Sequence, residues 1–375
     1  YCEDVETMKL SSTQENLSKA INTVGRIVST RASLPVLSHV LLSADSNRLR
    51  IAATNLEIGI NYWIGCKVEQ DGAVTAPARL LSEFVTNLPS GNLNIQASEA
   101  NLTITAKHYE SHINGITAEE FPMIPEVKSD PVVTLPADTL REAIAEVVVA
   151  AALDETRPVL AGVYMYIEEG NLVLVATDSF RLAERFIKLP KGNGTELNAI
   201  VPARTMQELV RILGDSTGDV KIYLAENQVM FQMEDIELVS RLIEGQFPNY
   251  RPIIPATDDT VATLSTAEFT RITKMANLFA RENGGSVRIE VQAEGEIRIM
   301  SSASQVGDNT SSAECDVSGD DSNISLNARF LSDALAVINT KRVSFSTSGK
   351  LNPCVIRPEG EKADDYLHII MPLRT

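Results

Sequence analysis

Apolar residues recur at helical spacing in three segments of the chain that begin in the same way. Pro77-Ala78-Arg79, Pro202-Ala203-Arg204 and Asn327-Ala328-Arg329 open these segments, so that successive segments start 125 positions apart. Within each segment the apolar residues fall three and four positions apart, which is the spacing of one face of an α-helix. The pattern therefore predicts three amphipathic helices, one in each of three repeats.

A second helix is predicted ahead of each of these segments. Ser12 and Glu15 form a capping-box pattern before the first, and Asp138 and Thr266 are expected to cap the second and the third. Apolar residues follow each cap at helical spacing, as at Leu17, Ile21, Val24 and Val28 in the first repeat. The chain is thus expected to contain six helices, two in each repeat.

Between the helices the apolar residues alternate with polar ones, which is typical of strands. Val287, Ile289 and Val291 lead into the pair Glu294-Gly295, after which Ile297 and Ile299 continue the alternation as in a β-hairpin. One helix pair against antiparallel strands is an α+β arrangement. Proline-rich connectors at residues 122–136 and 252–260 predict three similar domains, which we place at residues 8–126, 134–255 and 256–375.

Composition narrows the choice of compartment. The 375 residues hold no apolar run of about 18 residues, so no transmembrane helix is expected. Cys2, Cys66, Cys315 and Cys354 lie far apart and form no metal-type pair, which favours a reducing cytoplasm. Met8-Lys9-Leu10 is typical of a natural start, and the acidic residues before Met8 lack the apolar stretch of a signal peptide.

The net charge of −17 limits how the protein can meet nucleic acid. A conventional DNA-binding protein gains affinity by releasing counterions with a basic face. This composition is compatible with a DNA partner only if the basic residues are segregated on one surface, or if binding is topological.

No motif in the chain predicts catalysis. Phosphate-binding loops, dinucleotide-binding loops, zinc-protease motifs and nucleophile elbows are all absent from the sequence. His108 and His112 are four residues apart and could share a metal, but they lie in a strand-like stretch without a carboxylate motif, so two surface histidines are the favoured interpretation. Two alternatives remain: an enzyme with an unrecognised acidic site, such as a hydrolase, and a repeat adhesin or carbohydrate-binding protein.

Several motifs occur in an order that resembles one family. They are Leu34-Pro35-Val36-Leu37, Pro77-Ala78-Arg79, Ala176-Thr177-Asp178, Arg181-Leu182, Gly245-x-Phe247-Pro248-x-Tyr250-Arg251 and the terminal Ile370-Met371-Pro372-Leu373-Arg374. Together with the threefold repeat, they resemble the beta subunits of bacterial DNA polymerase III, the sliding clamps, from about Met8 to Arg374. The resemblance implies three clamp domains per chain and a head-to-tail dimeric ring. It also implies a non-catalytic processivity factor without a cofactor or a metal.

By resemblance, the ring encircles double-stranded DNA without sequence preference, which accommodates the negative charge of the chain. Basic residues are available on the predicted helices, among them Lys19, Arg26 and Arg211. The DNA-facing positions that the resemblance favours are Arg31, Arg79 and Arg204. Leu278 and Phe279 are placed in the interface of the homodimer, with core packing as the competing explanation.

The family also implies a peptide-binding groove between the second and third domains. Its partners would be the DNA polymerase III catalytic subunit, the clamp loader and other clamp-motif proteins. Carried over by motif, the groove consists of Arg157, Leu160, Thr177, Ser179, Phe180, Arg181, Leu182, Pro248, Ile253, Asn327, Phe330, Leu351, Pro353, Ile369, Ile370, Met371, Pro372, Leu373 and Arg374. Within this set, plain core packing is the alternative for Leu160, Leu182 and Ile253.

A few positions depart from the pattern of the family. Ser179 stands where glycine is common, Phe180 where histidine is common, and Phe330 where tyrosine is frequent. Thr375 extends past the usual end of the chain. These departures affect the polar details of peptide recognition rather than the existence of the groove.

Overall fold

A computed structural model of the protein describes residues 7–29, 34–154, 156–190, 196–214, 216–305, 307–361 and 363–374. The alternation in the sequence becomes strands with one buried face. Along strand β7 (Asn92–Ser98), for example, Leu93, Ile95 and Ala97 are buried and the residues between them are exposed. One face is buried because successive side chains point to opposite faces of a sheet. The strand pairs are antiparallel, as between β7 and its neighbours.

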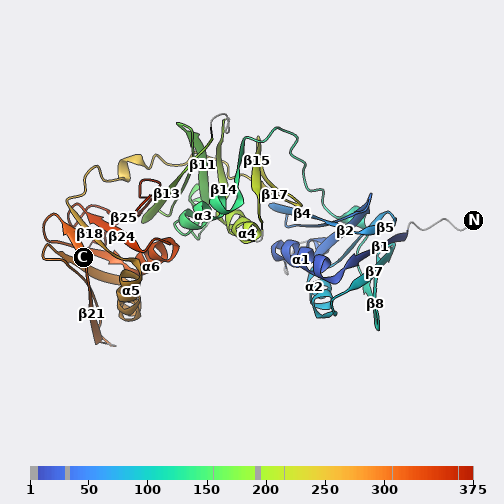
Figure 1. Ribbon diagram of the computed structural model, residues 1–375, viewed down its shortest axis with the longest axis horizontal. Helices are drawn as coiled ribbons and strands as arrows, with labels where there is room; N and C mark the ends of the chain where they lie inside the picture. The colour runs from blue at the N-terminus through green and yellow to red at the C-terminus, as the bar shows by residue number, and fades with distance from the viewer. Residues whose placement is uncertain are drawn as a thin grey trace, which may run out of the picture. The chain divides into compact units, whose positions relative to one another are not determined.

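The chain forms two compact units, one of residues 1–138 and 211–242 and the other of residues 139–210 and 243–375. The chain passes from one unit to the other within helix α3 (Ala137–Val148), within helix α4 (Ala203–Leu213) and after residue 242. Each unit contains one small and one large antiparallel sheet. The elements are labelled in Figure 1.

Unit 1 contains a five-stranded and an eight-stranded sheet. The smaller sheet has the order β5 (Lys67–Gln70), β1 (Thr7–Thr13), β7, β8 (Asn101–Ala106), β9 (Tyr109–Asn114). The larger has the order β10 (Val133–Pro136), β15 (Asp219–Ala225), β16 (Gln228–Met233), β17 (Ile236–Arg241), β4 (Ile58–Gly65), β3 (Arg48–Thr54), β2 (His39–Asp45), β6 (Gly72–Pro77). Its helices are α1 (Gln14–Val24), α2 (Ala78–Asn87) and the short η1 (Gly25–Ile27), η2 (Pro35–Ser38) and η3 (Ala118–Glu120).

Unit 2 contains a nine-stranded and a four-stranded sheet. The larger has the order β14 (Asn198–Pro202), β11 (Gly162–Glu168), β12 (Asn171–Thr177), β13 (Arg181–Lys188), β26 (Tyr366–Ile370), β25 (Cys354–Pro358), β24 (Arg342–Thr347), β18 (Thr260–Ser265), β22 (Asp316–Ser318). The smaller has the order β21 (Gly307–Glu314), β20 (Glu296–Ala303), β19 (Ser286–Gln292), β23 (Ser322–Asn327). Its helices include α5 (Thr266–Ala280), α6 (Ala328–Val337) and the short η4 (Pro158–Leu160), η5 (Arg251–Ile253) and η6 (Arg281–Asn283).

The two large sheets each join strands of two successive repeats. In unit 1, β17 of the second repeat pairs with β4 of the first, with Ser240 opposite Ile58. In unit 2, β13 of the second repeat pairs with β26 of the third, with Arg181 opposite Ile370. Main-chain hydrogen bonds therefore cross both repeat boundaries, so the compact units and the sequence repeats do not coincide.

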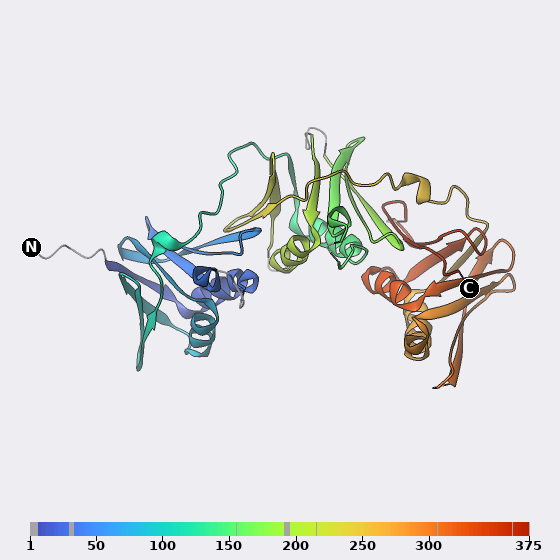
Figure 2. The same cartoon turned by 180° about the vertical axis from the view of Figure 1, so that it is seen from behind.

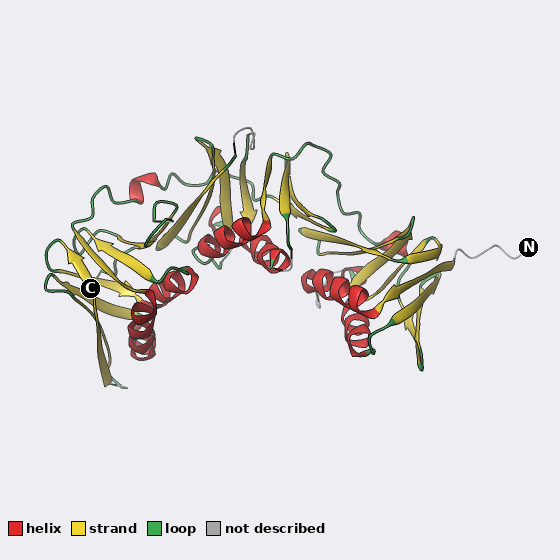
Figure 3. Cartoon of the chain, in the orientation of Figure 1, coloured by secondary structure: helices red, strands yellow, loops and turns green. Residues whose placement is uncertain are grey.

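Within each unit, a helix pair covers one side of the strands. Leu17, Ile21 and Val24 of α1 are completely buried, as the helical spacing predicts. Figure 3 shows α1 and α2 packed together in unit 1 and α5 and α6 packed together in unit 2, each pair against strands. The predicted six helices, two in each repeat, are confirmed among the described residues.

The predicted helix caps were each wrong by one or two residues. Helix α1 is capped by Thr13, whose side chain accepts a hydrogen bond from the backbone N–H of Asn16; Ser12 is still part of strand β1. Helix α5 is capped by Ser265, one residue before Thr266. Asp138 lies inside the first turn of α3, where its charge suits the helix dipole. The cap is the last residue with extended backbone, and sequence alone does not locate that residue.

The predicted hairpin and the two histidines of the first repeat lie where the sequence predicts them. The hairpin around Glu294-Gly295 is formed by β19 and β20, with Ile289 opposite Ile299. His112 lies in edge strand β9 and His108 in the turn before it. In the described part of the chain no group of three or more metal-binding side chains comes together. No helix there is long and apolar enough to cross a membrane.

Candidate functional site

A tight turn between β12 and β13 presents Phe180 to solvent. The Thr177 hydroxyl donates to the carbonyl of Arg181 at 2.6 Å and accepts from the N–H of Ser179 at 3.1 Å. The Asp178 carboxylate accepts from the N–H groups of Phe180 at 2.9 Å and Arg181 at 3.0 Å. These bonds hold Ser179 in the left-handed region, with φ of 77°. The Phe180 side chain is left 60% exposed at the tip.

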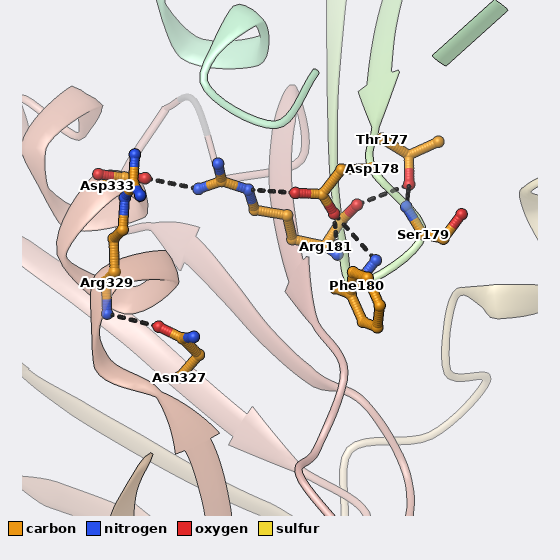
Figure 4. Close-up of polar contacts among 8 residues, drawn as sticks. All are labelled: Thr177, Asp178, Ser179, Phe180, Arg181, Asn327, Arg329 and Asp333. Atoms are coloured by element: carbon orange, nitrogen blue, oxygen red, sulfur yellow. Dashed lines mark hydrogen bonds and ion pairs between the residues drawn. The ribbon is translucent and has the colours of Figure 1, made fainter. Parts of the chain in front are cut away.

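Arg181 connects this turn to helix α6. Its Nε lies 3.0 Å from Asp178 Oδ2 and its Nη1 lies 2.6 Å from Asp333 Oδ2. The guanidinium also lies 4.4 Å from the centre of the Phe330 ring, a cation–π distance. Figure 4 shows the guanidinium between the two carboxylates. With only 5% of its side chain exposed, Arg181 is committed to these contacts and supports Phe330 from within.

The end of the chain lies against the same turn. After β26, the N–H of Met371 donates to the carbonyl of Phe180 at 2.8 Å, and the N–H of Leu373 donates to the carbonyl of Ser325 at 2.8 Å. Met371, Pro372 and Leu373 are half-buried. The tail is thereby held between a turn of the second repeat and strand β23 of the third.

The residues predicted to bind peptide divide into a buried and an exposed group. Leu160, Thr177, Arg181, Leu182, Ile369 and Ile370 are buried. Arg157, Ser179, Phe180, Pro248, Ile253, Leu351 and Arg374 are exposed, and Asn327, Phe330, Pro353, Met371, Pro372 and Leu373 are half-buried. Core packing, the alternative for Leu160 and Leu182, therefore describes those two residues, whereas Ile253 is open to solvent. We call the exposed and half-buried members the C-terminal surface.

The connector that carries Pro248 and Ile253 is anchored to the sheet by aromatic residues. Phe247 stacks on Tyr164, with 5.0 Å between the ring centres, and Tyr250 donates a hydrogen bond to the carboxyl of Glu184 on β13. Burial raises the pKa of Glu184, and the hydrogen bond from the Tyr250 hydroxyl offsets part of that rise. Seen from behind in Figure 2, this connector, with η5, runs on the side of the strands away from α6.

Strands β13 and β26 also carry a layer of buried polar side chains, on the face opposite the connector. Arg185 Nε lies 2.9 Å from Glu146 Oε2, and the Tyr366 hydroxyl donates to the Glu146 carbonyl at 3.2 Å. Nδ1 of His368 lies 3.1 Å from the Tyr366 hydroxyl. Burial, assisted by the Arg181 cation, lowers the pKa of His368 to about 3, so this histidine is neutral at physiological pH.

Sequence reasoning missed part of this arrangement. Asp178 lies within the motif Ala176-Thr177-Asp178. An Asp that follows an alternating segment is a signal for a turn, and this signal could have been used. Asp333 carries no such signal, since it meets Arg181 only through the fold.

The predicted DNA-facing residues are partly described. Arg204 is exposed on α4, and Arg79 is exposed on α2, where its Nε lies 2.9 Å from Glu83 Oε1 and this hydrogen bond raises the pKa of Arg79. Arg31 lies outside the described residues. Three helix-borne cations line one cavity of about 560 Å³ in unit 1, together with Lys221: they are Lys19, Arg26 and Arg211.

The predicted interface residues lie on α5. Leu278 is 55% exposed, which core packing does not explain, and Phe279 is half-buried. In unit 1, Leu80 on α2 and Tyr109 on β9 are about half exposed as well. Each unit thus presents large apolar side chains that nothing in the described part of the same unit covers.

Comparisons with known proteins agree with these features. Family models of the DNA polymerase III beta subunit match in chain order: the N-terminal domain over residues 8–125, the central domain over 134–249 and the C-terminal domain over 251–374. The beta sliding clamp of Bacillus subtilis is 30% identical over 379 residues, which cover 98% of this chain and all of that protein. That of Staphylococcus aureus is 29% identical over 365 residues, 95% of this chain and 96% of that one.

Solved structures show the same likeness. The Bacillus subtilis sliding clamp superposes with a TM-score of 0.92 at 28% identity and covers 98% of this chain and 99% of that chain. A clamp from Pseudomonas aeruginosa bound to griselimycin has a TM-score of 0.91 at 25% identity, covering 98% of this chain and all of that one.

Fold and matches together define the class of protein, a DNA sliding clamp that acts as a non-catalytic processivity factor for a DNA polymerase. The chain belongs to the family of bacterial DNA polymerase III beta subunits.

Proposed function

We propose that the chain forms a head-to-tail homodimeric ring that encircles double-stranded DNA in the bacterial cytoplasm. The three clamp domains would span residues 8–126, 134–255 and 256–375. Uncovered apolar side chains support a dimer, because Leu278 in unit 2 and Leu80 and Tyr109 in unit 1 are each about half exposed. Enclosure suits a chain of net charge −17, since a ring stays on DNA without adhering tightly to phosphates.

The second part of the proposal concerns the tether, by which we mean the attachment of partner proteins to the ring. Linear motifs of the DNA polymerase III catalytic subunit, of the clamp loader and of other clamp-motif proteins would bind at the C-terminal surface. The observation that carries this is the exposed Phe180, whose carbonyl accepts the N–H of Met371, together with the exposed Ile253 and Leu351 in the same unit. A few apolar anchors on a preorganised backbone are the usual means of binding a short peptide.

The residues would have distinct parts in binding. Phe180, Ile253, Leu351 and Met371 would contact apolar side chains of the peptide. Arg157 and Arg374 are exposed and would donate to peptide carbonyls or carboxylates. The Arg157 side chain is already directed to this place, since its Nη1 donates to the Ser179 hydroxyl at 2.9 Å.

A fluorescence anisotropy titration tests the tether. The probe is a labelled Gln-Leu-Asp-Leu-Phe peptide, titrated with the intact protein and with protein that ends at Ile370. Saturable binding by the intact protein that is lost on truncation is expected. A folded intact protein that does not bind the peptide would overturn the proposal. A truncated protein that binds equally well would remove the tail from the site.

A further inference from the structure

Unit 1 contains a copy of the turn that presents Phe180 in unit 2. In the first copy the Thr54 hydroxyl donates to the carbonyl of Ile58 at 3.0 Å, as the Thr177 hydroxyl does to that of Arg181 at 2.6 Å. The Asn55 side chain accepts from the N–H of Ile58 at 2.8 Å, in the manner of the Asp178 carboxylate and Arg181 at 3.0 Å. The repeat in the sequence therefore extends to the hydrogen bonds of the candidate site.

The two turns also have a residue with left-handed backbone conformation at the equivalent position. Leu56 has φ of 75° and Ser179 has φ of 77°. A leucine pays a steric cost in this region, which the surrounding hydrogen bonds must offset. The result is a leucine side chain that is 45% exposed in unit 1.

A cavity of about 90 Å³ lies beside this turn in unit 1. The sheet register places it where the C-terminal surface lies in unit 2. Ile58 pairs with Ser240 as Arg181 pairs with Ile370, so Val239 and Arg241 stand in the positions of Ile369 and Met371. The cavity is lined among others by Thr54, Leu56, Met123, Ile124, Val239 and Arg241.

The cavity beside the turn in unit 1 differs from the C-terminal surface of unit 2 in size and in charge. Gly59 stands where unit 2 has Leu182, and Ile124 fills the space above it, its Cγ2 lying 2.8 Å from where a Cβ of Gly59 would be. Met123, beside Ile124, is 91% exposed. The remaining space suits a single small apolar side chain rather than several anchors.

Two charged groups replace apolar side chains at the rim. Glu57 stands in the position of Phe180 and Arg241 in that of Met371; both are exposed, and neither has an ion pair with another described residue. The cavity has a mixed lining that also includes Glu57 and Gln228. The Arg241 guanidinium forms no ion pair with Glu57, which lies opposite it across the strand pair, so it complements a ligand that carries a carboxylate near an aliphatic group.

We propose that this cavity of unit 1 is a second, weaker docking site, which takes an extended peptide segment with one aliphatic side chain next to a carboxylate. The Arg241 guanidinium binds the carboxylate, and Leu56, Met123 and Val239 surround the aliphatic group. The peptide class rests on the proposed function of the C-terminal surface. The cavity and its charge are features of unit 1 alone.

Methyl NMR of the intact protein, labelled in its methionine and isoleucine methyl groups, tests the proposal with unlabelled acetyl-Gln-Leu-Asp-Leu-Phe as the probe. The Met371 signal reports on the C-terminal surface, and the Met123 and Ile124 signals report on the cavity. The expected result is two saturable steps, with Met371 moving first and the other two at peptide concentrations about tenfold higher or more.

Variants identify the second step. Arg241→Ser is expected to weaken it about tenfold and leave the first step unchanged. Lys221→Ser, a substitution of another exposed cation of unit 1, is the matched control and should change neither step. Ile124→Ala opens the space above Gly59 and should strengthen the second step, provided that the methyl spectrum shows an intact fold.

The outcomes separate the two proposals. A Met371 signal that saturates while Met123 and Ile124 stay still overturns the second site and leaves the proposed function in place. Movement of Met123 and Ile124 without Met371 supports the second site and contradicts the tether. Equal shifts of Met123 with a C-terminally amidated peptide that has Lys in place of Asp, and so carries no carboxylate, would overturn the carboxylate contact.

Discussion

The carboxylate of Asp333 lies 2.6 Å from Nη1 of Arg181, and this ion pair joins helix α6 to strand β13. The two residues are 152 positions apart in the chain. Phe330, on the same helix, lies over the guanidinium, so the ion pair holds one member of the C-terminal surface in place.

Asp333→Asn is expected to loosen α6 and to weaken peptide binding. Arg181 would remain buried with one carboxylate instead of two, at a cost of about 1–2 kcal/mol, because Asp333 is itself one-third exposed. Thermal unfolding and peptide anisotropy measure the two effects. Asp364→Asn, at an exposed acid, is the control. Unchanged stability and affinity in Asp333→Asn would show that the ion pair contributes nothing.

Phe180→Ala is expected to separate binding from stability. The side chain is 60% exposed, so the free energy of unfolding should change by less than about 0.5 kcal/mol. The backbone bond from Met371 to the Phe180 carbonyl does not involve the side chain and should persist. Peptide affinity should fall about tenfold if the ring is an anchor. An unchanged Kd in the anisotropy titration would exclude Phe180 from the contact.

His368 should make the protein less stable as the pH falls. Its pKa is about 3 in the folded chain and 6.5 ordinarily, so below pH 6.5 the unfolded chain binds a proton that the folded chain rejects. This contribution to stability is complete above pH 6.5 and declines by about 1.4 kcal/mol per pH unit as the pH falls toward 3.

His368→Leu should remove that decline. The Tyr366 hydroxyl keeps its bond to the Glu146 carbonyl, so no polar group is left without a partner. Urea unfolding of both proteins at pH 7.5, 6.0 and 5.0 gives the comparison. The difference between them should shift in favour of the variant as the pH falls. Parallel pH profiles would contradict a neutral buried histidine.

Leu278→Asp is expected to break the proposed dimer without unfolding the chain. The residue is 55% exposed, so a charge is tolerated in the monomer but not in an apolar interface. Sedimentation equilibrium should give half the mass of the parent protein. Leu153→Asp, at another exposed leucine of unit 2, should leave the mass unchanged. A parent protein that is itself monomeric at every concentration would argue against the ring.

Arg204→Ala and Arg79→Ala should lower the affinity for duplex DNA to different extents. Anisotropy with a labelled linear duplex at several salt concentrations gives the salt slope, which falls by about 1 for each phosphate contact that is lost. Arg204 should show the larger change, because Arg79 already pairs with Glu83 at 2.9 Å. Identical slopes for Arg204→Ala and the parent would remove Arg204 from the DNA-facing set.

Local patterns were enough to predict much of the fold. The motif at Pro77, Pro202 and Asn327 marks the start of α2, α4 and α6, and the hairpin at Gly295 lies where the alternation predicts it. Helical and strand periodicity depend on residues close in the sequence, so these elements can be recognised without the fold. The helix caps could not, since they depend on where an extended strand ends.

The sequence by itself determined the three repeats, their paired helices and, through its motifs, the family to which the chain belongs. Only the tertiary structure decided which predicted site residues are buried, as Leu182 is, and which are exposed, as Phe180 is, although the two are two positions apart. It alone brought Asp333 to Arg181 and joined successive repeats in one sheet. The physical reason is that the Arg181–Asp333 ion pair and the pairing of β13 with β26 join residues more than a hundred positions apart, for which no local pattern exists.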